Sequence, residues 1–182
     1  MIMSVSKATP KPKTKNLRER ESRIQDNMSN LQTYFDLLFS KNLDKLLDLI
    51  HPNIEWLVVP TGDMIKGQEE FIKLSKNHWA ASPNRMKKLI NLFANEEYGS
   101  LEYISGGTLT VDTNFGSIKI AATGSLYELR GCFVLHFTDG RIDQVREYFD
   151  MESVAMFAHN HPMNDGPDVH NSAIISGENP VK

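Results

Sequence analysis

One carboxylate in this chain occupies a position where carboxylates are costly. Residues 127–137 alternate between apolar and mixed side chains, which is the pattern of a strand with one apolar face. After an Asp-Gly turn signal at 139–140 the alternation resumes and places Glu147 between Val145 and Phe149 on the apolar face. A carboxylate there is destabilising unless it is paired, hydrogen-bonded or protonated. Glu147 is therefore the leading candidate for a general acid or base.

Each candidate also has a purely structural interpretation. Glu147 could instead form a buried ion pair with Arg85, Arg130 or Arg141. His78 lies on the face of a predicted helix that should cover a pocket, where it could stabilise a developing charge or could simply be a hydrogen-bonded core histidine. Both interpretations stay open from the sequence.

The elements that must position these residues begin with helices. Apolar residues recur at helical spacing at five positions: Ile24, Met28, Leu31, Phe35 and Leu38. This stripe predicts a helix of about 18 residues. A second helix is predicted over 43–50 with Asn42 as its N-cap, and a third over 68–79.

Strand signals dominate the rest of the domain. Runs rich in β-branched and aromatic residues, or alternating, cover 54–59, 86–96, 100–111, 117–137 and 141–149. Helices followed by antiparallel strands predict an α+β domain, in which a curved antiparallel sheet wraps around three N-terminal helices and leaves a cone with an open mouth. We expect one set of side chains to face the helices: Tyr127, Leu129, Phe133, Val145 and Phe149. We expect another set to face solvent or a partner: Glu128, Arg130, His136 and Arg146.

Composition excludes several classes of protein. The net charge is −3, and residues 1–27 carry seven Lys or Arg against three Asp or Glu. The rest of the chain therefore has a net charge of about −7 and offers no basic surface for nucleic acid. No run of 18 apolar residues is present, so no membrane span is expected. Cys132 is the only cysteine, which excludes an internal disulfide and suits the reducing cytoplasm.

The two ends differ in composition from the middle. We expect a disordered basic tail over 1–19, a folded domain over 20–158 and a disordered tail over 159–182. The second tail holds His159, His161 and His170, but a Pro- and Gly-rich segment offers no rigid ligand geometry. No metal and no other cofactor is expected.

Five short motifs, in this order and spacing, resemble a known family. They are Gly-Gln-Glu-Glu at 67–70, Ala-Thr-Gly-Ser at 122–125, Arg-Gly-Cys-Phe-Val at 130–134, Thr-Asp-Gly-Arg-Ile at 138–142 and Arg-Glu-Tyr-Phe-Asp at 146–150. The chain resembles the SnoaL-like branch of the nuclear transport factor 2-like superfamily over residues 28–158. The resemblance implies a pocket inside the cone and a homodimer through the outer face of the sheet. It implies no single reaction, because relatives include limonene epoxide hydrolase, ketosteroid isomerase and polyketide cyclase.

The comparison with the epoxide hydrolase is incomplete. Glu147 stands where that enzyme has a proton-donating aspartate. Gly106 and Thr108 stand where it has an arginine and a second aspartate, and Trp56 and Val58 where it holds water with polar groups. The resemblance therefore implies a proton donor without the complete epoxide hydrolase triad.

The comparison with ketosteroid isomerase adds a different residue. Tyr34 aligns with that enzyme's oxyanion-stabilising tyrosine, whereas its catalytic base aligns with Val58. Tyr34 could equally pack with its hydroxyl toward a backbone carbonyl.

Three functions remain possible. The first is a cofactor-independent enzyme acting on a small hydrophobic molecule through Glu147, with Tyr34 or His78 stabilising charge. The second is a non-catalytic binding protein for an apolar metabolite, and the third is a dimerisation or adaptor domain. The predicted substrate-binding residues are Trp56, Val58, Tyr127, Leu129, Phe133 and Phe149. The predicted dimer interface centres on Leu126, Cys132 and Val134. An open cavity beside Glu147 would favour the first two functions, and a filled cone the third.

Overall fold

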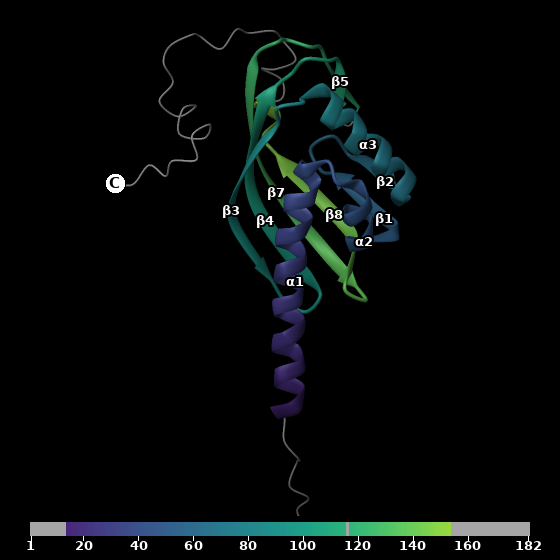
Figure 1. Ribbon diagram of the computed structural model, residues 1–182, viewed down its shortest axis with the longest axis vertical. Helices are drawn as coiled ribbons and strands as arrows, with labels where there is room; N and C mark the ends of the chain where they lie inside the picture. The colour runs from purple at the N-terminus through teal and green to yellow at the C-terminus, as the bar shows by residue number, and fades with distance from the viewer. Residues whose placement is uncertain (1–13, 116, 154–182) are drawn as a thin grey trace, which may run out of the picture.

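The computed structural model describes residues 14–115 and 117–153 (Figure 1). The helices of the described residues are α1 (Thr14–Ser40) and α2 (Leu43–Leu49), which precede the first strand, and α3 (Gly67–Ala81), which follows the second strand. The strands are β1 (Ile50–Val58), β2 (Asp63–Lys66), β3 (Met86–Ala94), β4 (Tyr98–Thr108), β5 (Thr113–Phe115), β6 (Ile118–Ile120), β7 (Leu126–Thr138) and β8 (Arg141–Phe149). The helices lie against one face of the curved main sheet. This confirms the predicted α+β class.

The first helix is longer than its apolar stripe predicts. α1 has 27 residues, and its N-terminal part projects beyond the end of the sheet (Figure 1). It begins at Thr14, so the boundary predicted at about residue 20 falls inside it. Arg20 and Arg23 both pair with Glu96 in the connection between β3 and β4, which ties this part of the helix to the sheet. The predicted tails lie mostly outside the described residues.

The main sheet is mixed rather than purely antiparallel. Its strand order is β2-β1-β8-β7-β4-β3, and β1 pairs with β8 in parallel while the other pairs are antiparallel. The chain between β1 and β8 includes α3 and most of the strands, which is ample length for a parallel connection. β1 and β8 lie together near the middle of the sheet, so the strand that carries Glu147 is flanked on both sides.

Two local predictions were wrong. The predicted strands leave out residues 63–66, which form β2 and pair with β1 as a short edge strand. The run predicted as one strand over 117–137 is two strands, β6 and β7, and β6 pairs with β5 in a separate two-stranded sheet. β5 carries no apolar run long enough to be found by pattern alone.

The predicted faces of β7 and β8 are confirmed at most positions. Leu129, Phe133 and Val145 are buried, while Arg130 and Arg146 are exposed. Tyr127 and Phe149 are half-buried, as are Glu128 and His136. The alternation therefore predicted the direction of each side chain better than its degree of burial.

One inward residue of β8 contradicts simple alternation. Ile142 is fully buried although its position places it on the opposite face from Val145. Phe137 pairs with Ile142 and His136 with Gln144, so Asp143 is an extra residue at a β-bulge. A bulge exchanges the faces on either side of it, which is why Ile142 and Val145 both point inward.

The core lies between α1, α2, α3 and the inner face of the sheet. It consists mainly of large apolar side chains, among them Leu31, Phe35, Leu46, Phe71, Leu101 and Leu135. A smaller second cluster contains Ala81, Leu109, Ile120 and Leu129. None of the helices within the described residues is both long and apolar enough to cross a membrane.

Candidate functional site

Glu147 lies in the interior of the cone. Its strand neighbours are Val58 on β1 and Phe133 on β7, and its own side chain is only 5% exposed. The Tyr103 hydroxyl donates a hydrogen bond of 2.7 Å to Glu147 Oε1. The Tyr103 hydroxyl therefore holds one oxygen of a buried carboxyl group whose neighbours on the adjacent strands are apolar.

Tyr103 can reach Glu147 because the strand between them carries a glycine. Tyr103 on β4 pairs with Gly131 on β7, and a Cβ at Gly131 would lie 2.5 Å from the tyrosine hydroxyl oxygen. Any larger residue at 131 would therefore displace the ring. The ring also stacks on Phe133 with a centroid separation of 4.8 Å and an interplanar angle of 22°, which fixes its orientation.

The pKa of Glu147 is raised from 4.5 to about 7. Burial is the main cause, because it penalises the charged form, while the hydrogen bond from Tyr103, the positive charge of Arg85 and the indole of Trp56 lower the pKa in part. A carboxyl group with a pKa near 7 can both give and take a proton at neutral pH. This is the protonation behaviour expected of an acid–base catalyst.

The ion pairs considered for Glu147 are not formed. Among the described residues, no Lys, Arg or His nitrogen lies within 4.0 Å of its carboxylate. Arg130 instead pairs with Glu128 at 3.0 Å, and Arg141 is exposed. Arg85 acts on Glu147 only through its electric field.

Tyr34 lies on α1 next to the same site. It is completely buried, and its hydroxyl has no hydrogen-bond partner among the described residues, so the alternative of a bond to a backbone carbonyl is not observed. Burial, with a smaller contribution from the Glu147 charge, raises the pKa of Tyr34 well above its usual value of 10.0. The residue thus remains a neutral hydroxyl donor that a ligand could engage.

His78 lies on α3 at the edge of the site. Burial and the nearby Arg85 charge lower its pKa to about 3, while a hydrogen bond with the backbone of Asn114 acts in the opposite direction. The imidazole is therefore neutral at physiological pH. It can position a group through hydrogen bonding, but it cannot serve as a cation.

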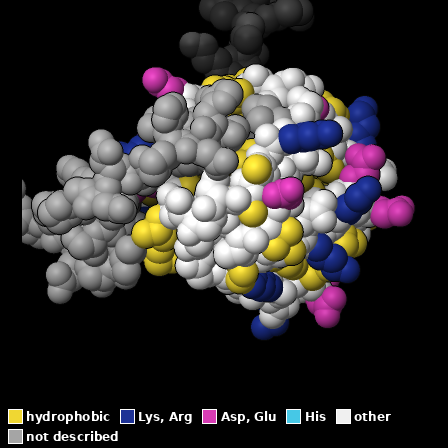
Figure 2. Space-filling view, turned by 90° about the horizontal axis from the view of Figure 1, so that it is seen from above, with side chains coloured by type: hydrophobic (Ala, Val, Ile, Leu, Met, Phe, Trp, Pro, Cys, Tyr) yellow, Lys and Arg dark blue, Asp and Glu magenta, His cyan; other side chains and the backbone are white. Residues whose placement is uncertain are grey.

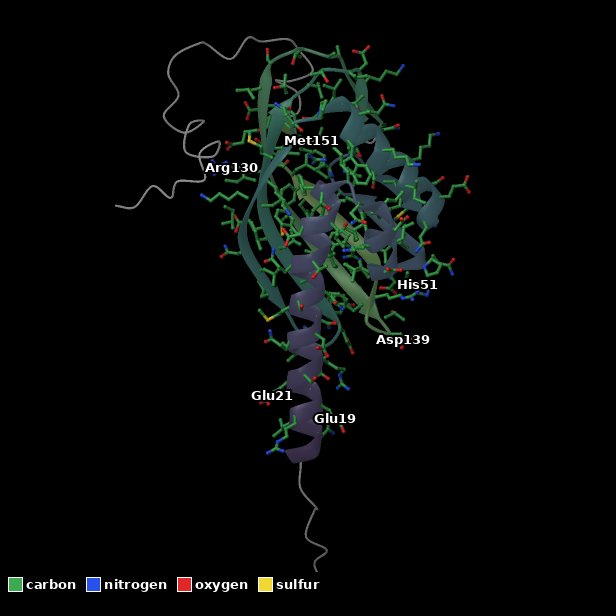
Figure 3. The ribbon with its side chains drawn as sticks, in the orientation of Figure 1. Glu19, Glu21, His51, Arg130, Asp139 and Met151 are labelled. Atoms are coloured by element: carbon green, nitrogen blue, oxygen red, sulfur yellow. The ribbon has the colours of Figure 1, made fainter. Side chains whose placement is uncertain are left out.

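The open cavity that the cone shape suggested is almost filled. The cavity beside Glu147 has a volume of about 10 Å³, which is room for about one water molecule. Its lining residues are Leu38, Trp56, Leu74, Ser75, His78, Trp79, Arg85, Phe133 and Glu147. Figure 3 shows Arg130 projecting outward from the sheet, away from the helices. Seen from above, the described part of the surface presents scattered apolar and charged side chains without a wide opening (Figure 2).

The predicted substrate-binding residues separate into two groups. Trp56 and Phe133 line the cavity, and Val58 is buried in the same core cluster. Tyr127 and Leu129 belong to the smaller cluster around Ala81 and Leu109. Phe149 is half-buried and packs against both clusters. A role for each residue in binding stays a prediction.

The sequence did not indicate Tyr103 as a residue of the site. Tyr103 lies on a strand whose neighbours the sequence does not determine, so its approach to Glu147 could not be predicted. Arg85 was predicted only as a possible ion-pair partner of Glu147, whereas it lines the cavity. The alternation of Leu101, Tyr103 and Ser105 was an available signal, because it places a phenol on the inner face of β4.

A metal site is not evident in the part of the chain that the structure describes. No group of three or more His, Cys, Asp or Glu residues there has the arrangement of a metal site. His159, His161 and His170 lie outside the described residues.

Comparison with known proteins identifies the fold. A family model described as a SnoaL-like domain matches residues 31–145. No curated protein sequence matches the chain. A protein assigned as a SnoaL-like polyketide cyclase from Jannaschia sp. CCS1 is similar in structure, with a TM-score of 0.67 and 13% identity over 76% of this chain and 95% of that one.

Two further solved structures show the same fold. One is assigned as a ketosteroid isomerase from Kribbella flavida, with a TM-score of 0.55 and 14% identity over 70% of this chain and 79% of that one. The other is SalBIII, described as an epoxide hydrolase/cyclase-like enzyme in pyran ring formation in salinomycin, with a TM-score of 0.59 and 15% identity over 71% of this chain and 94% of that one. At such identities the similarity establishes the fold alone.

Proposed function

Because this chain belongs to the SnoaL-like domain family, we propose that it is an enzyme that performs cofactor-independent acid–base chemistry on a small hydrophobic substrate inside the cone. The reaction class is isomerisation, cyclisation or hydrolysis, which are also the classes named for its structural relatives. The observation that carries the proposal is the buried carboxyl group of Glu147 with a pKa of about 7. A catalytic acid or base works best when its pKa lies close to the working pH.

The surrounding residues have complementary roles in this proposal. Glu147 transfers the proton, and Tyr103 orients its carboxyl group through the 2.7 Å hydrogen bond. Tyr34 offers a free buried hydroxyl for an oxygen on which negative charge develops. Neutral His78 supplies a further polar contact at the edge of the cavity. The apolar walls formed by Trp56 and Phe133 would hold the hydrocarbon part of the substrate.

Substrate entry requires side chains to move, because the cavity holds only about one water. The half-buried lining residues His78, Trp79 and Arg85 lie close together in the chain, at the end of α3 and in the following loop. Rotation of these side chains would enlarge the cavity without disturbing the sheet. Such rearrangements on binding are common at interfaces and sites whose backbone stays in place.

The test is a conversion assay on a mixture of small metabolites. The wild-type protein and Glu147→Gln are incubated with the same metabolite extract, and mass spectrometry records compounds consumed and formed. The matched control is Glu69→Gln, because Glu69 is exposed in the first turn of α3 and does not line the cavity. We expect conversion by the wild type and the control but not by Glu147→Gln. Equal conversion by all three proteins would refute the role of Glu147.

The nearly filled cone favours a second candidate, a dimerisation or adaptor domain without catalysis. The outer face of the sheet carries a groove of about 680 Å³ that includes Phe93, Cys132 and Tyr148. Phe93 is 65% exposed and Tyr148 is 41% exposed, and exposed apolar side chains of this kind are typical of an interface. We propose a homodimer through this face. Sedimentation of the wild type and Phe93→Glu tests it, and a wild type that is monomeric at micromolar concentration would contradict it.

A further inference from the structure

Arg85 is held beside the cavity by the packing of its loop. It follows Ser82 in the connection between α3 and β3, and its backbone N–H donates to the Ser82 carbonyl. Gly107 on β4 lies directly beneath: a Cβ there would be 2.3 Å from Ser82 Oγ and 3.1 Å from Arg85 Cα. The absence of a side chain at 107 lets the loop lie on the sheet. This contact sets the backbone from which the Arg85 side chain reaches the cavity.

The charge of Arg85 is not balanced by an ion pair. Among the described residues, no carboxylate oxygen lies within 4.0 Å of its nitrogens, and its buried Nε has no hydrogen-bond partner. The guanidinium carbon lies 4.6 Å from the centre of the Phe39 ring, which supports a cation without neutralising it. A buried guanidinium N–H without a partner is unfavourable, and an anion that accepted a hydrogen bond from it would relieve this.

Other groups at the site do not supply that anion. Glu147 lines the same cavity as Arg85, but its carboxylate is not within ion-pair distance and exists partly in the neutral form at pH 7. The neighbouring cation, Lys87, is already bound by Asp36. Among the described residues, Arg85 therefore remains an unmatched positive charge in the lining of the cavity.

We propose that Arg85 is a substrate-anchoring residue that binds the carboxylate of a small apolar carboxylic acid, whose hydrocarbon part then lies against Trp56 and Phe133 beside Glu147. The anchoring role of Arg85 names a substrate class for the proposed function. It rests on that function only because both use the same cavity. A planar guanidinium binds a carboxylate through two parallel hydrogen bonds. A single cation suits a monoanion better than a dianion such as a phosphate ester.

Binding of model acids tests the anchor without any turnover. Benzoate and 1-naphthoate are titrated into the full-length protein by calorimetry, with benzamide and 1-naphthamide as neutral analogues of similar shape. We expect the wild type to bind each acid with a Kd about tenfold or more below that of its amide. This ratio corresponds to one charge-assisted hydrogen bond that the amide cannot form. Arg85→Gln should lose the preference while binding the amides unchanged. Arg85→Lys should keep a weaker preference, because it retains the charge but not the paired donors.

The matched control is Arg130→Gln, which removes the same charge from an exposed arginine on the outer face. It should bind the acids as the wild type does, and thermal melts should show that all variants are folded. The anchor would be refuted by equal affinity for acids and amides, by an undiminished preference in Arg85→Gln, by an equal loss in Arg130→Gln, or by no binding of any acid at millimolar concentration. Glu147→Gln should keep the acid preference, so a failed catalytic role and a failed anchor give different results.

Discussion

Two carboxyl groups four residues apart on β8, those of Asp143 and Glu147, have pKa values that are shifted in opposite directions. Burial raises the pKa of Glu147 to about 7, and one tyrosine hydrogen bond, the Arg85 charge and the Trp56 indole only partly offset it. Burial also raises the pKa of Asp143, but hydrogen bonds from His136 and Thr138 and the His136 charge outweigh it, so the pKa lies below 3.8. Asp143 is tied by two contacts, of 2.7 Å to His136 and 2.8 Å from Thr138.

The difference shows what prepares a carboxyl group for proton transfer. Asp143 has a partner for each oxygen and is also partly exposed, so it stays charged at neutral pH. Glu147 is almost completely buried, and the Tyr103 hydroxyl bonds only its Oε1 oxygen, so its charged form is disfavoured. The same strand thus carries one carboxyl group that stays charged at neutral pH and one that is partly protonated there.

The largest expected difference between Glu147 and Asp143 is the loss of reaction rate when each acid is replaced by its amide. Once a substrate is known, Glu147→Gln should reduce kcat by roughly two to four orders of magnitude, because the amide cannot transfer the proton. Asp143→Asn should change kcat by less than about threefold, since it lies on the other face of the sheet. Steady-state kinetics on both variants provide the measurement. Similar losses in the two variants would remove the distinction.

The next effect concerns stability and its dependence on pH. The folded pKa of Glu147 is raised, so the folded state holds the proton more tightly, and its contribution to stability falls as pH rises from 4.5 to about 7. Over this window the wild type should lose roughly 3 kcal/mol relative to Glu147→Gln, which does not titrate. Urea unfolding at pH 5 and pH 8 provides the comparison. At pH 8 the variant should be at least as stable as the wild type, whereas a buried ion pair would make it less stable by about 3 kcal/mol.

A smaller effect is expected for the hydrogen bond to Glu147. Tyr103→Phe removes the hydroxyl but keeps the ring on Phe133. The hydrogen bond lowers the pKa of Glu147, so its loss should raise that pKa further and cost about 1 kcal/mol of stability. A pH titration of the variant measures the first effect and chemical unfolding the second. An unchanged or lowered Glu147 pKa would show that Tyr103 does not act on the carboxyl group.

The smallest effect is expected on the outer face. Asp143→Asn weakens the contacts with His136 and Thr138 and should cost about 1 kcal/mol at pH 7. The folded pKa of Asp143 is depressed, so this contribution is present above 3.8 and is lost as the pH falls through the folded pKa. The wild type and the variant should therefore converge in stability once the pH is below the folded pKa of Asp143. A difference that persisted there would point to packing instead of charge.

Local patterns predicted the inner face of β8 but not its surroundings. The alternation around Val145 and Phe149 placed Glu147 inside because each strand residue reverses direction. It could not reveal the bulge at Asp143, which depends on pairing with β7, and therefore put Ile142 on the wrong face. It also could not reveal which strands flank β8, because the parallel pairing with β1 joins distant parts of the chain.

The surroundings of Glu147 could not be predicted because they are formed by residues far from it in the sequence. Tyr103 approaches Glu147 only because Gly131 intervenes on the strand between them, a relation that needs the register of three strands. Arg85 reaches the cavity from a loop, where no periodicity indicates direction. The near absence of free volume was also unpredictable, because packing of side chains from helices and sheet decides it.

The most direct test of the account is the pKa of Glu147 itself. With ¹³C-labelled glutamate, the side-chain carboxyl resonance of Glu147 can be identified by its absence in Glu147→Gln and followed as a function of pH. We expect a titration midpoint of about 7, well above the ordinary glutamate pKa of 4.5. A midpoint at or below 4.5 would mean that the carboxyl group is paired or solvated in solution, and it would contradict the proposed acid–base role.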